Sequence, residues 1–312
     1  LGDLTLTTPF IHALRKAAPD AHITMLVDEK LKDVVLFNPY LDEVVTIDKK
    51  GRDNSILSLW ACSRHLSKLD FDVLINLHPN ERCSFIDAMT SVKLRTGTTH
   101  KIFKWFWDVF TPLDRSMHAA DMYLDVLQQL GVQDLSNNGL EIFPGEEHFL
   151  EAELFWQEQN ITDQDKLIGF NIGSAVPTKR WPPERFAEVA DIFAAKGYKT
   201  VFFGGPMDEE MVAEATGYMQ TRPIIATGHF AIGGLAAAMR RCCLIITNDS
   251  GPMHVAISQK VPIVAMYGPS NPKLYGPYTK DAVIVTAQPP CQGCADGMKH
   301  SCDDLQCMSR MT

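Results

Sequence analysis

The stretch "IITNDSGPMH" carries the side chains best suited to chemistry in this 312-residue chain. An apolar strand is expected to run into Asp249 and Ser250, and a helix is expected to begin at Gly251. Free N–H groups at a helix N-terminus attract anions, and the Ser250 hydroxyl adds a donor beside them. His254, one turn into the helix, would face the same opening. Taken alone, Asp249 or Ser250 could simply cap the helix, so the stretch is not specific by itself.

The stretch "NIGSAVPTKRW" offers a second candidate anion site at the expected end of another strand. Gly173 and Ser174 form a small-residue turn that a phosphate could approach closely. Lys179 supplies a point charge, and the guanidinium of Arg180 supplies a planar fork of donors. Both cations could instead be solvated surface charges. Their position beside a Gly-Ser turn, in a chain with a formal net charge of −9, favours anion binding.

Two more expected strand ends, "FFGGPMDEE" and "MYGPSNP", are also rich in glycine. Gly204 and Gly205 would let a ligand approach the backbone, and Asp208 could accept hydrogen bonds from ribose hydroxyls. Asp208 could equally complement the charge of a helix N-terminus. Gly268 is expected at the same edge. Several such turns at successive strand ends are jointly more specific than any one of them.

Alternating strands and helices would bring these turns together. In the first half, strands are predicted at 22–28, 43–48, 72–78 and 94–98, and helices at 5–18, 30–37, 55–68, 83–90 and 118–131. In the second half, strands are predicted at 167–173, 198–205, 223–228, 243–249, 261–268 and 282–287, and helices at 183–196, 208–219, 231–240 and 251–258. This alternation is typical of parallel sheets with crossover helices, which bind ligands at the carboxyl ends of their strands.

Asn, Gly and Pro interrupt the alternation at 132–148, which is the best domain boundary in the chain. We therefore predict an α/β fold made of two doubly wound Rossmann-like domains, 1–145 and 146–312, that face each other across a cleft. The functional site is expected in that cleft.

Composition excludes several classes of function. The chain is acidic and has no block of Lys and Arg, so we expect no nucleic-acid partner. The longest apolar runs, "LIGF" and "VPIVAMYG", are too short to span a bilayer, and we expect a cytoplasmic protein. The patterns G-x-G-x-x-G, G-x-x-x-x-G-K-[ST], G-x-S-x-G and H-E-x-x-H are missing from the sequence, which disfavours standard dinucleotide, P-loop, hydrolase and metalloprotease sites.

Four of the eight cysteines are clustered near the end of the chain. Cys291, Cys294, Cys302 and Cys307 follow a C-x2-C-x7-C-x4-C spacing, which could bind zinc, form disulfides or belong to a reduced tail. No second C-x2-C pair strengthens the zinc interpretation.

Five stretches, taken in order, resemble the pattern of glycosyltransferase family 9, the lipopolysaccharide heptosyltransferases: "LGDLTLTTP", "TKRWPPERF", "FFGGPMDE", "NDSGPMHVA" and "VAMYGPSNP". The resemblance covers nearly the whole chain. It implies a two-domain GT-B fold, with an N-terminal acceptor-binding domain and a C-terminal domain that binds a nucleotide-sugar donor. It also implies an inverting, metal-independent transfer of a heptose from ADP-heptose to a lipid-linked saccharide of the lipopolysaccharide core.

The resemblance also implies roles for single residues. Asp3 matches the acid proposed as the general base of the family. Ser174 and Lys179 match the turn and the lysine at the donor diphosphate. The donor motif of the family matches Asp249, Ser250, Gly251 and His254, and Asp208 falls near its ribose-side acid.

Inversion of the sugar requires a base on the side opposite the departing diphosphate. We expect Asp3 on one domain to face Lys179, Arg180 and the Gly251 helix on the other, which would stabilise the leaving group without a metal. The simpler interpretation of Asp3 is a helix cap. We also expect that the polypeptide extends beyond Leu1 and Thr312, and that a short strand upstream delivers Gly2 and Asp3 to the edge of the first sheet.

The segment "HKIFKWFWDVF" in the first half combines lysines with aromatic residues. Lys101, Lys104, Trp105, Phe106 and Trp107 could form an amphipathic face that contacts the cytoplasmic face of the inner membrane. A buried aromatic segment is the simpler interpretation. Two alternatives to transfer stay open: a nucleotide-sugar epimerase on the same architecture, and a non-catalytic sugar-nucleotide binding protein, which would need no base.

Overall fold

A computed structural model describes residues 1–112, 114–291, 293–294 and 302–311. The chain forms two compact units, each built from more than one stretch of sequence. Unit 1 comprises Leu1–Thr8, Asp33–Asn38 and Gly139–Thr312, and unit 2 comprises Pro9–Lys32 and Pro39–Asn138. This division differs from the predicted boundary at 145/146, since it falls at 138/139 and groups Leu1–Thr8 with the C-terminal half.

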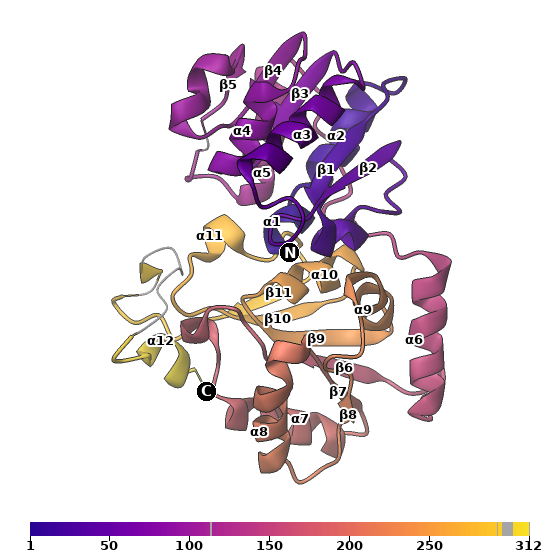
Figure 1. The fold of residues 1–312 in the computed structure, drawn as a ribbon. Coiled ribbons are helices and arrows are strands. Elements are labelled where there is room, and N and C mark those ends of the chain that lie inside the picture. Colours follow the sequence, from indigo (N-terminus) through magenta and orange to yellow (C-terminus); the bar gives the residue numbers. More distant parts are fainter. Residues whose placement is uncertain (113, 292, 295–301, 312) are drawn as a thin grey trace. The chain divides into compact units, whose positions relative to one another are not determined.

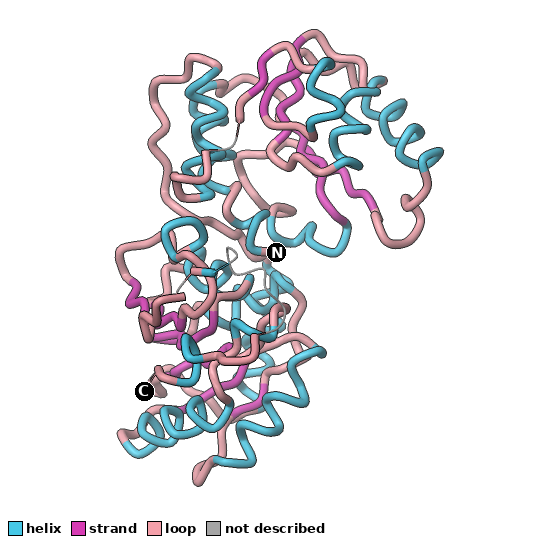
Figure 2. Tube along the Cα trace, turned by 90° about the vertical axis from the view of Figure 1, so that its left-hand side faces the viewer, coloured by secondary structure: helices cyan, strands magenta, loops and turns pink. Residues whose placement is uncertain are grey.

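Unit 1 is built on a six-stranded parallel sheet with the strand order β11-β10-β9-β6-β7-β8. Its strands are β6 Leu167–Asn171, β7 Lys199–Phe203, β8 Ile224–Ile225, β9 Cys242–Asn248, β10 Ile263–Met266 and β11 Ala282–Val285. Figure 2 shows them as a layer with helices on either side. All six strands predicted for this half of the chain are confirmed, and so is the α/β fold class.

The helices of unit 1 include the crossover connections that a parallel sheet requires. They are α6 Glu146–Glu158, α7 Pro183–Ala195, α8 Glu209–Tyr218, α9 Ile232–Met239, α10 Gly251–Ser258, α11 Pro272–Tyr275 and α12 Gln306–Ser309, with α1 Gly2–Thr5. Two short 3₁₀ helices, η3 Pro177–Lys179 and η4 Pro206–Asp208, lie in strand-end loops. Helices α7 and α8 pack together on one face of the sheet, and α9 and α10 lie on the other (Figure 1).

The core of unit 1 lies between β6, β7 and the helices that cover them. Phe170 and Phe202 stack with ring centroids 5.1 Å apart, and Phe186 of α7 lies edge-on to Trp181. Met308 of α12 belongs to the same buried cluster. Burying large side chains of this kind contributes roughly 1.5–3 kcal/mol each, so the sheet gives the strand-end loops a rigid base.

Unit 2 contains two parallel sheets, β1-β2 and β3-β4-β5. The strands are β1 Thr24–Asp28, β2 Glu43–Ile47, β3 Val73–Asn76, β4 Leu94–Gly97 and β5 Val109–Phe110. The helices are α2 Thr8–Ala17, α3 Ile56–Ser67, α4 Glu81–Met89 and α5 Ala119–Gln129, with the 3₁₀ helix η2 Lys101–Phe106. Ile47, Leu59, Leu66 and Ile86 form one core cluster of this unit. The four strands predicted for this half are confirmed, and β5 was not predicted.

Two helices predicted in the first half differ from the structure. The segment predicted as a helix at 30–37 forms the short 3₁₀ helix η1 Glu29–Val34. The single helix predicted at 5–18 is two helices, α1 and α2. The break follows from the threonines between them, because the hydroxyls of Thr7 and Thr8 donate to the carbonyls of Leu4 and Thr5 and so compete with a continuous helix.

Candidate functional site

The carboxyl ends of the parallel strands of unit 1 bring three glycine-containing loops together. The side chain of Asn248, at the end of β9, holds the loop after β6 through two hydrogen bonds. Its Oδ1 accepts from the Trp181 N–H at 3.0 Å, and its Nδ2 donates to the Ile172 carbonyl at 2.7 Å. Trp181 is fixed from a second side, because its indole N–H donates to the Met311 carbonyl at 3.1 Å. The loop after β6 therefore has a fixed conformation beside the loop after β9.

Ser174 and Ser250 lie at this edge, in the loops after the neighbouring strands β6 and β9. The amide of Asn171, the last residue of β6, donates to the Ser250 hydroxyl at 2.9 Å and to the Thr247 hydroxyl at 3.2 Å. The Ser174 hydroxyl lies 3.4 Å from the carbonyl oxygen of Asp249. The Ser250 hydroxyl accepts from Asn171 and makes no capping hydrogen bond to the helix that follows it.

Lys179 and Asp249 form a buried ion pair. The Lys179 Nζ atom lies 2.7 Å from Oδ2 of Asp249, and the exposed fractions of the two side chains are 15% and 6%. The hydroxyl of Ser270, in the loop after β10, donates to the same oxygen at 2.5 Å. Side chains from the loops after β6 and β10 thus converge on one carboxylate oxygen of the loop after β9.

Tyr267 lies next to this group and is fully buried. Its hydroxyl donates to the Tyr275 carbonyl at 2.8 Å. Burial raises the pKa of Tyr267 well above its usual value, and the negative charge of Asp249 raises it further. The phenol is therefore a neutral packing residue behind the carboxylate at any physiological pH.

Arg180 is placed at the same edge but in a different role from Lys179. Its Nε donates to the Ser174 carbonyl at 2.9 Å, so the guanidinium braces the small-residue turn after β6. The terminal nitrogens lie beyond that contact. Arg180 can therefore hold the turn and still present charge to a ligand.

The first turn of α10 lies against the beginning of the chain. A Cβ atom built on Gly251 would be 3.0 Å from Cβ of Leu1, and one built on Gly2 would be 3.3 Å from Cδ2 of His254. His254 is buried. The glycines at both positions permit this close packing, so "LGD" and "NDSGPMH" lie side by side within unit 1, although roughly 250 residues of sequence separate them.

Asp3 lies in the first turn of α1, and its side chain is exposed. Within the described part of the chain, its carboxylate makes no ion pair or hydrogen bond that would fix it. The helix-cap interpretation is not supported, because α1 begins at Gly2 and has no side-chain cap. The sequence interpretation placed Asp3 on the N-terminal domain, whereas the structure groups it with Gly251 in unit 1.

Asp208 has a local partner. Its Oδ2 accepts from the Gly205 N–H at 2.9 Å, and the side chain is buried. A Cβ atom on Gly173 would come within 2.1 Å of Oδ1 of Asp208. The carboxylate therefore fills the space between two strand-end loops. Its contact with a ribose stays a prediction.

The four clustered cysteines are all free thiols. Cys307 is buried in α12, and its Sγ lies 3.1 Å from a Cβ built on Gly268. Burial, followed by the nearby Cys291, Cys294 and Cys302, raises the pKa of the Cys307 thiol. Among the described residues, no three His, Cys, Asp or Glu side chains are placed to hold a metal ion, and the whole spacer between Cys294 and Cys302 lies outside the described residues. Zinc binding stays a prediction from spacing.

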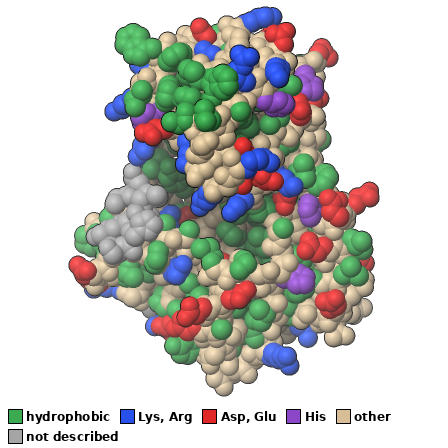
Figure 3. Space-filling view, viewed as in Figure 1, with side chains coloured by type: hydrophobic (Ala, Val, Ile, Leu, Met, Phe, Trp, Pro, Cys, Tyr) green, Lys and Arg blue, Asp and Glu red, His purple; other side chains and the backbone are tan. Residues whose placement is uncertain are grey.

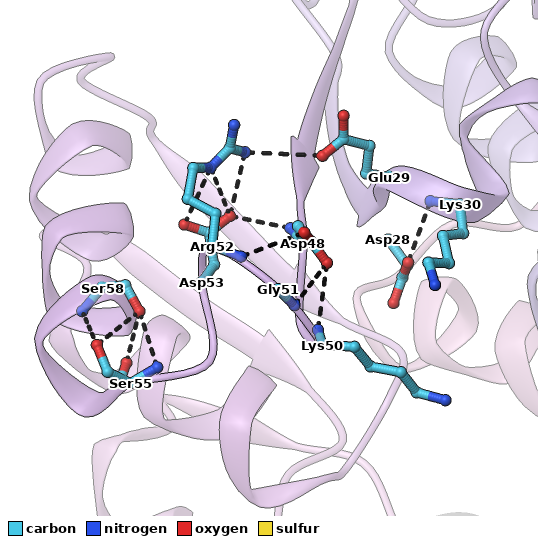
Figure 4. Close-up of polar contacts among 10 residues, drawn as sticks. All are labelled: Asp28, Glu29, Lys30, Asp48, Lys50, Gly51, Arg52, Asp53, Ser55 and Ser58. Carbon is cyan, nitrogen blue, oxygen red and sulfur yellow. Dashed lines mark hydrogen bonds and ion pairs between the residues drawn. The ribbon is translucent and has the colours of Figure 1, made fainter.

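In unit 2, the loop after β2 holds a cluster of hydrogen bonds and an ion pair (Figure 4). Asp48 accepts from the N–H groups of Gly51 and Arg52 at 2.9 and 3.2 Å, and these bonds lower the pKa of its carboxyl. Asp53 accepts from the Asp48 N–H at 2.9 Å and pairs with Arg52. The side chain of Lys50 points away from the loop (Figure 4). The sequence analysis singled out none of these residues.

Sequence reasoning also missed Asn171 and Ser270. Asn171 is the polar last residue of an apolar strand, and Ser270 follows another strand after a glycine turn. Those positions were the available signal. The aromatic segment was predicted only in part. Trp107 is buried and donates to the Thr96 carbonyl, whereas Trp105 is 94% exposed, which contradicts a fully buried segment.

Comparison with known proteins places these features in a family. The model of glycosyltransferase family 9 (heptosyltransferase) matches residues 59–302. The chain is 33% identical to lipopolysaccharide heptosyltransferase 2 of Escherichia coli K12 over 300 residues, covering 91% of this chain and 85% of that protein. No helix within the described ranges is long and apolar enough to cross a membrane.

Solved structures agree with this assignment. A family 9 glycosyl transferase from Veillonella parvula DSM 2008 superposes with a TM-score of 0.90 at 57% identity, covering 91% of this chain and 83% of that one. An E. coli heptosyltransferase solved with ADP superposes with a TM-score of 0.69 at 17% identity, covering 91% and 89%, and supports the GT-B fold. The chain belongs to glycosyltransferase family 9, the heptosyltransferases, and is an enzyme of the glycosyltransferase class.

Proposed function

We propose that this enzyme transfers a heptose from ADP-heptose to a saccharide acceptor of the lipopolysaccharide-core type, with inversion and without a metal. The observation that carries the proposal is the convergence of Ser174, Lys179, Ser250 and the first turn of α10 at one sheet edge of a family 9 chain. The ADP bound by the E. coli relative supports the choice of nucleotide.

The donor diphosphate would lie between Lys179, Arg180 and the N-terminus of α10. The first turn of α10 lacks a side-chain cap, which leaves backbone N–H groups for an anion, and Lys179 adds a positive charge in a largely buried position. Preorganised donors of this kind stabilise the charge that develops on the leaving diphosphate. They supply the role that a metal ion plays in other transferases, so we expect activity to survive treatment with EDTA.

Asp3 would act as the general base that removes the proton of the acceptor hydroxyl. Supporting this role, α1 begins against the first turn of α10, and the carboxylate of Asp3 is exposed to an incoming acceptor. Unit 2 would receive the acceptor, with Lys50 and Arg52 at the end of β2 as candidate contacts to its acidic groups.

A pair of variants tests these roles separately. Asp3→Asn is expected to keep donor affinity and to lower transfer by roughly 10²–10⁴-fold, the range of general-base catalysis. Lys179→Ala is expected to weaken donor binding itself. Retained turnover in the first variant removes Asp3 as the base, and unchanged affinity in the second removes Lys179 from the phosphate site.

A donor screen identifies the nucleotide. ADP-, GDP-, UDP- and CMP-sugars are compared by thermal shift, since a ligand that binds only the folded state raises the melting temperature. A selective response to ADP-sugars supports heptose transfer. A donor that is consumed without any acceptor would instead indicate an epimerase or a hydrolase, and binding without turnover would indicate a binding protein.

We also propose that unit 2 contacts the inner membrane surface through η2. Ile102 and Trp105 are exposed in η2, and Lys101 and Lys104 lie beside them. Figure 3 shows hydrophobic side chains gathered on the surface of unit 2. Exposed aromatic residues beside lysines suit an anionic lipid interface.

Vesicles of phosphatidylcholine with and without phosphatidylglycerol test this contact. The double variant Ile102→Ala, Trp105→Ala is expected to lose binding to anionic vesicles, whereas Leu150→Ala, at an exposed site on α6, is expected to keep it. The proposal would be wrong if the wild-type protein bound neither kind of vesicle, or if the double variant bound anionic vesicles as well as wild type.

A further inference from the structure

Ser270 and Lys179 share one acceptor, the Oδ2 atom of Asp249, although they come from different loops. The Lys179 Nζ atom lies 2.7 Å from this oxygen and the Ser270 hydroxyl lies 2.5 Å from it. The Ser270 side chain is 1% exposed. A buried serine hydroxyl with a charged acceptor makes a stronger hydrogen bond than one between neutral groups, so Ser270 restrains the carboxylate.

Lys179 needs such a restraint if it is to bind an anion. Its ammonium sits on a flexible four-carbon stem and has three donors, of which Asp249 takes one among the described residues. A phosphate that binds there competes with Asp249 for the ammonium. The second hydrogen bond, from Ser270, satisfies part of the charge on Asp249 and keeps the carboxylate in place, which leaves Lys179 directed toward a ligand.

The backbone around Ser270 is itself fixed on both sides. A Cβ atom on Gly268 would lie 2.2 Å from Sδ of Met308, so this loop packs closely against α12. Asn271 caps α11 by accepting from the Lys273 N–H at 3.0 Å. Ser270 therefore has little freedom to move, and its hydrogen bond holds the Asp249 carboxylate in one position.

We propose that Ser270 is a positioning residue for the donor site, acting on Lys179 through the shared oxygen of Asp249. The inference rests on the proposed function, because it assumes that Lys179 contacts the donor diphosphate. Ser270 itself is too deeply buried to contact the nucleotide.

ADP affinity in a double-mutant cycle tests this role. Calorimetry on the full chain compares wild type, Ser270→Ala, Lys179→Ala and the double variant. Loss of a hydrogen bond to a charged group predicts an affinity about tenfold weaker in Ser270→Ala. In the Lys179→Ala background, the same change is expected to have little further effect, because its influence passes through Lys179. Ser270→Thr, which keeps the hydroxyl, is expected to recover affinity.

Controls separate this role from a purely structural one. Ser258→Ala removes another buried serine hydroxyl, at the far end of α10, and is expected to bind ADP like wild type. Ser270→Cys keeps the side-chain volume with a weaker donor and replaces Ser270→Ala if that variant does not fold. The positioning role would be overturned if Ser270→Ala lost as much ADP affinity in the Lys179→Ala background as in wild type. It would also be overturned if neither Ser270→Ala nor Ser270→Cys lost ADP affinity. Wild-type protein without ADP affinity would overturn the proposed function itself.

Discussion

Gly173 lies so close to the buried carboxylate of Asp208 that the position has no room for a side chain. A Cβ atom there would be 2.1 Å from Oδ1 of Asp208, far inside van der Waals contact. Gly205, in the next loop, has more space, since its nearest neighbour would be 4.0 Å away. The two glycines look equivalent in the sequence, and only the structure distinguishes them.

Gly173→Ala is therefore expected to destabilise the protein by about 1–3 kcal/mol, the usual cost of overpacking, and to weaken ADP binding by moving the turn that carries Ser174. Gly205→Ala is the matched control, and its extended backbone accommodates alanine. Denaturant unfolding and ADP titration measure both effects. Similar losses of stability and ADP affinity in the two variants would show that the closeness of Asp208 to Gly173 is not the cause.

Asp87 in α4 is a buried acid that the proposed mechanism does not use. Burial raises the pKa of its carboxyl to about 8, and the nearby Arg95 offsets this only in part. Since the unfolded chain releases this proton near pH ~4, the folded state binds more protons between about pH 4 and 8. Stability from this group is therefore complete below about pH 4 and is lost as the pH rises toward about 8.

Asp87→Asn is expected to make the free energy of unfolding less dependent on pH in this range. At about pH 8 it should raise that free energy by an amount on the order of 1–3 kcal/mol. Urea unfolding of unit 2 at about pH 5 and about pH 8, followed through a probe in that unit, measures the change. Asp20→Asn, at an exposed site in the same unit, serves as the control. An unchanged slope in Asp87→Asn would show that the carboxyl is ionised in the folded state.

At the scale of elements, strands were predicted well because their signal is local. "LIGFN" and "CCLIITN" are apolar runs that end in a polar residue, and each forms a buried strand of unit 1. Helix α6 was missed although Ala152, Phe155 and Trp156 follow a helical spacing and are buried. Its N-cap is Gly145, whose N–H donates to Nδ1 of His148, and a histidine at this position is not the Glu or Gln of the usual capping box.

The strand-end positions of the proposed site residues were predicted for the same local reason. Ser270 was not predicted, because its importance depends on the distant Asp249. The grouping of Leu1–Thr8 with the C-terminal half could not be read from the sequence either, since it depends on packing between α1 and α10. Periodicity reports the structure of a segment and says nothing about its distant neighbours.

The break between α1 and α2 is held by Thr8, which is 1% exposed. Its hydroxyl donates to the Thr5 carbonyl at 2.8 Å and accepts from the Glu141 N–H at 3.0 Å. Thr8→Val keeps the shape and leaves a backbone donor without its partner, so we expect a loss of about 1–3 kcal/mol in unfolding free energy. Thr7→Val, which loses only a local bond to Leu4, should cost less. A larger loss of unfolding free energy in Thr7→Val than in Thr8→Val would contradict the role given to Thr8.

At the scale of the whole molecule, the candidate donor site belongs to one unit. The loops after β6, β9 and β10 lie in unit 1, and Leu1–Thr8 lies in the same unit. Unit 2 contributes none of the residues of the candidate donor site. A ligand that binds only these residues should stabilise unit 1 directly, because it shifts the local opening equilibria of the segments it contacts.

Hydrogen exchange with and without ADP tests whether unit 1 alone binds the donor nucleotide. We expect slower exchange with ADP at 171–181, 248–254 and 268–271, and at the N-terminal Leu1–Thr8, because α1 packs on the first turn of α10. Peptides from β3 and β4 in unit 2 should exchange at the same rate with and without ADP, and they provide the internal control. Lys179→Ala should lose the protection in unit 1 at the same ADP concentration. Protection of β3 and β4 as strong as that of the unit 1 loops would show that unit 2 takes part in donor binding.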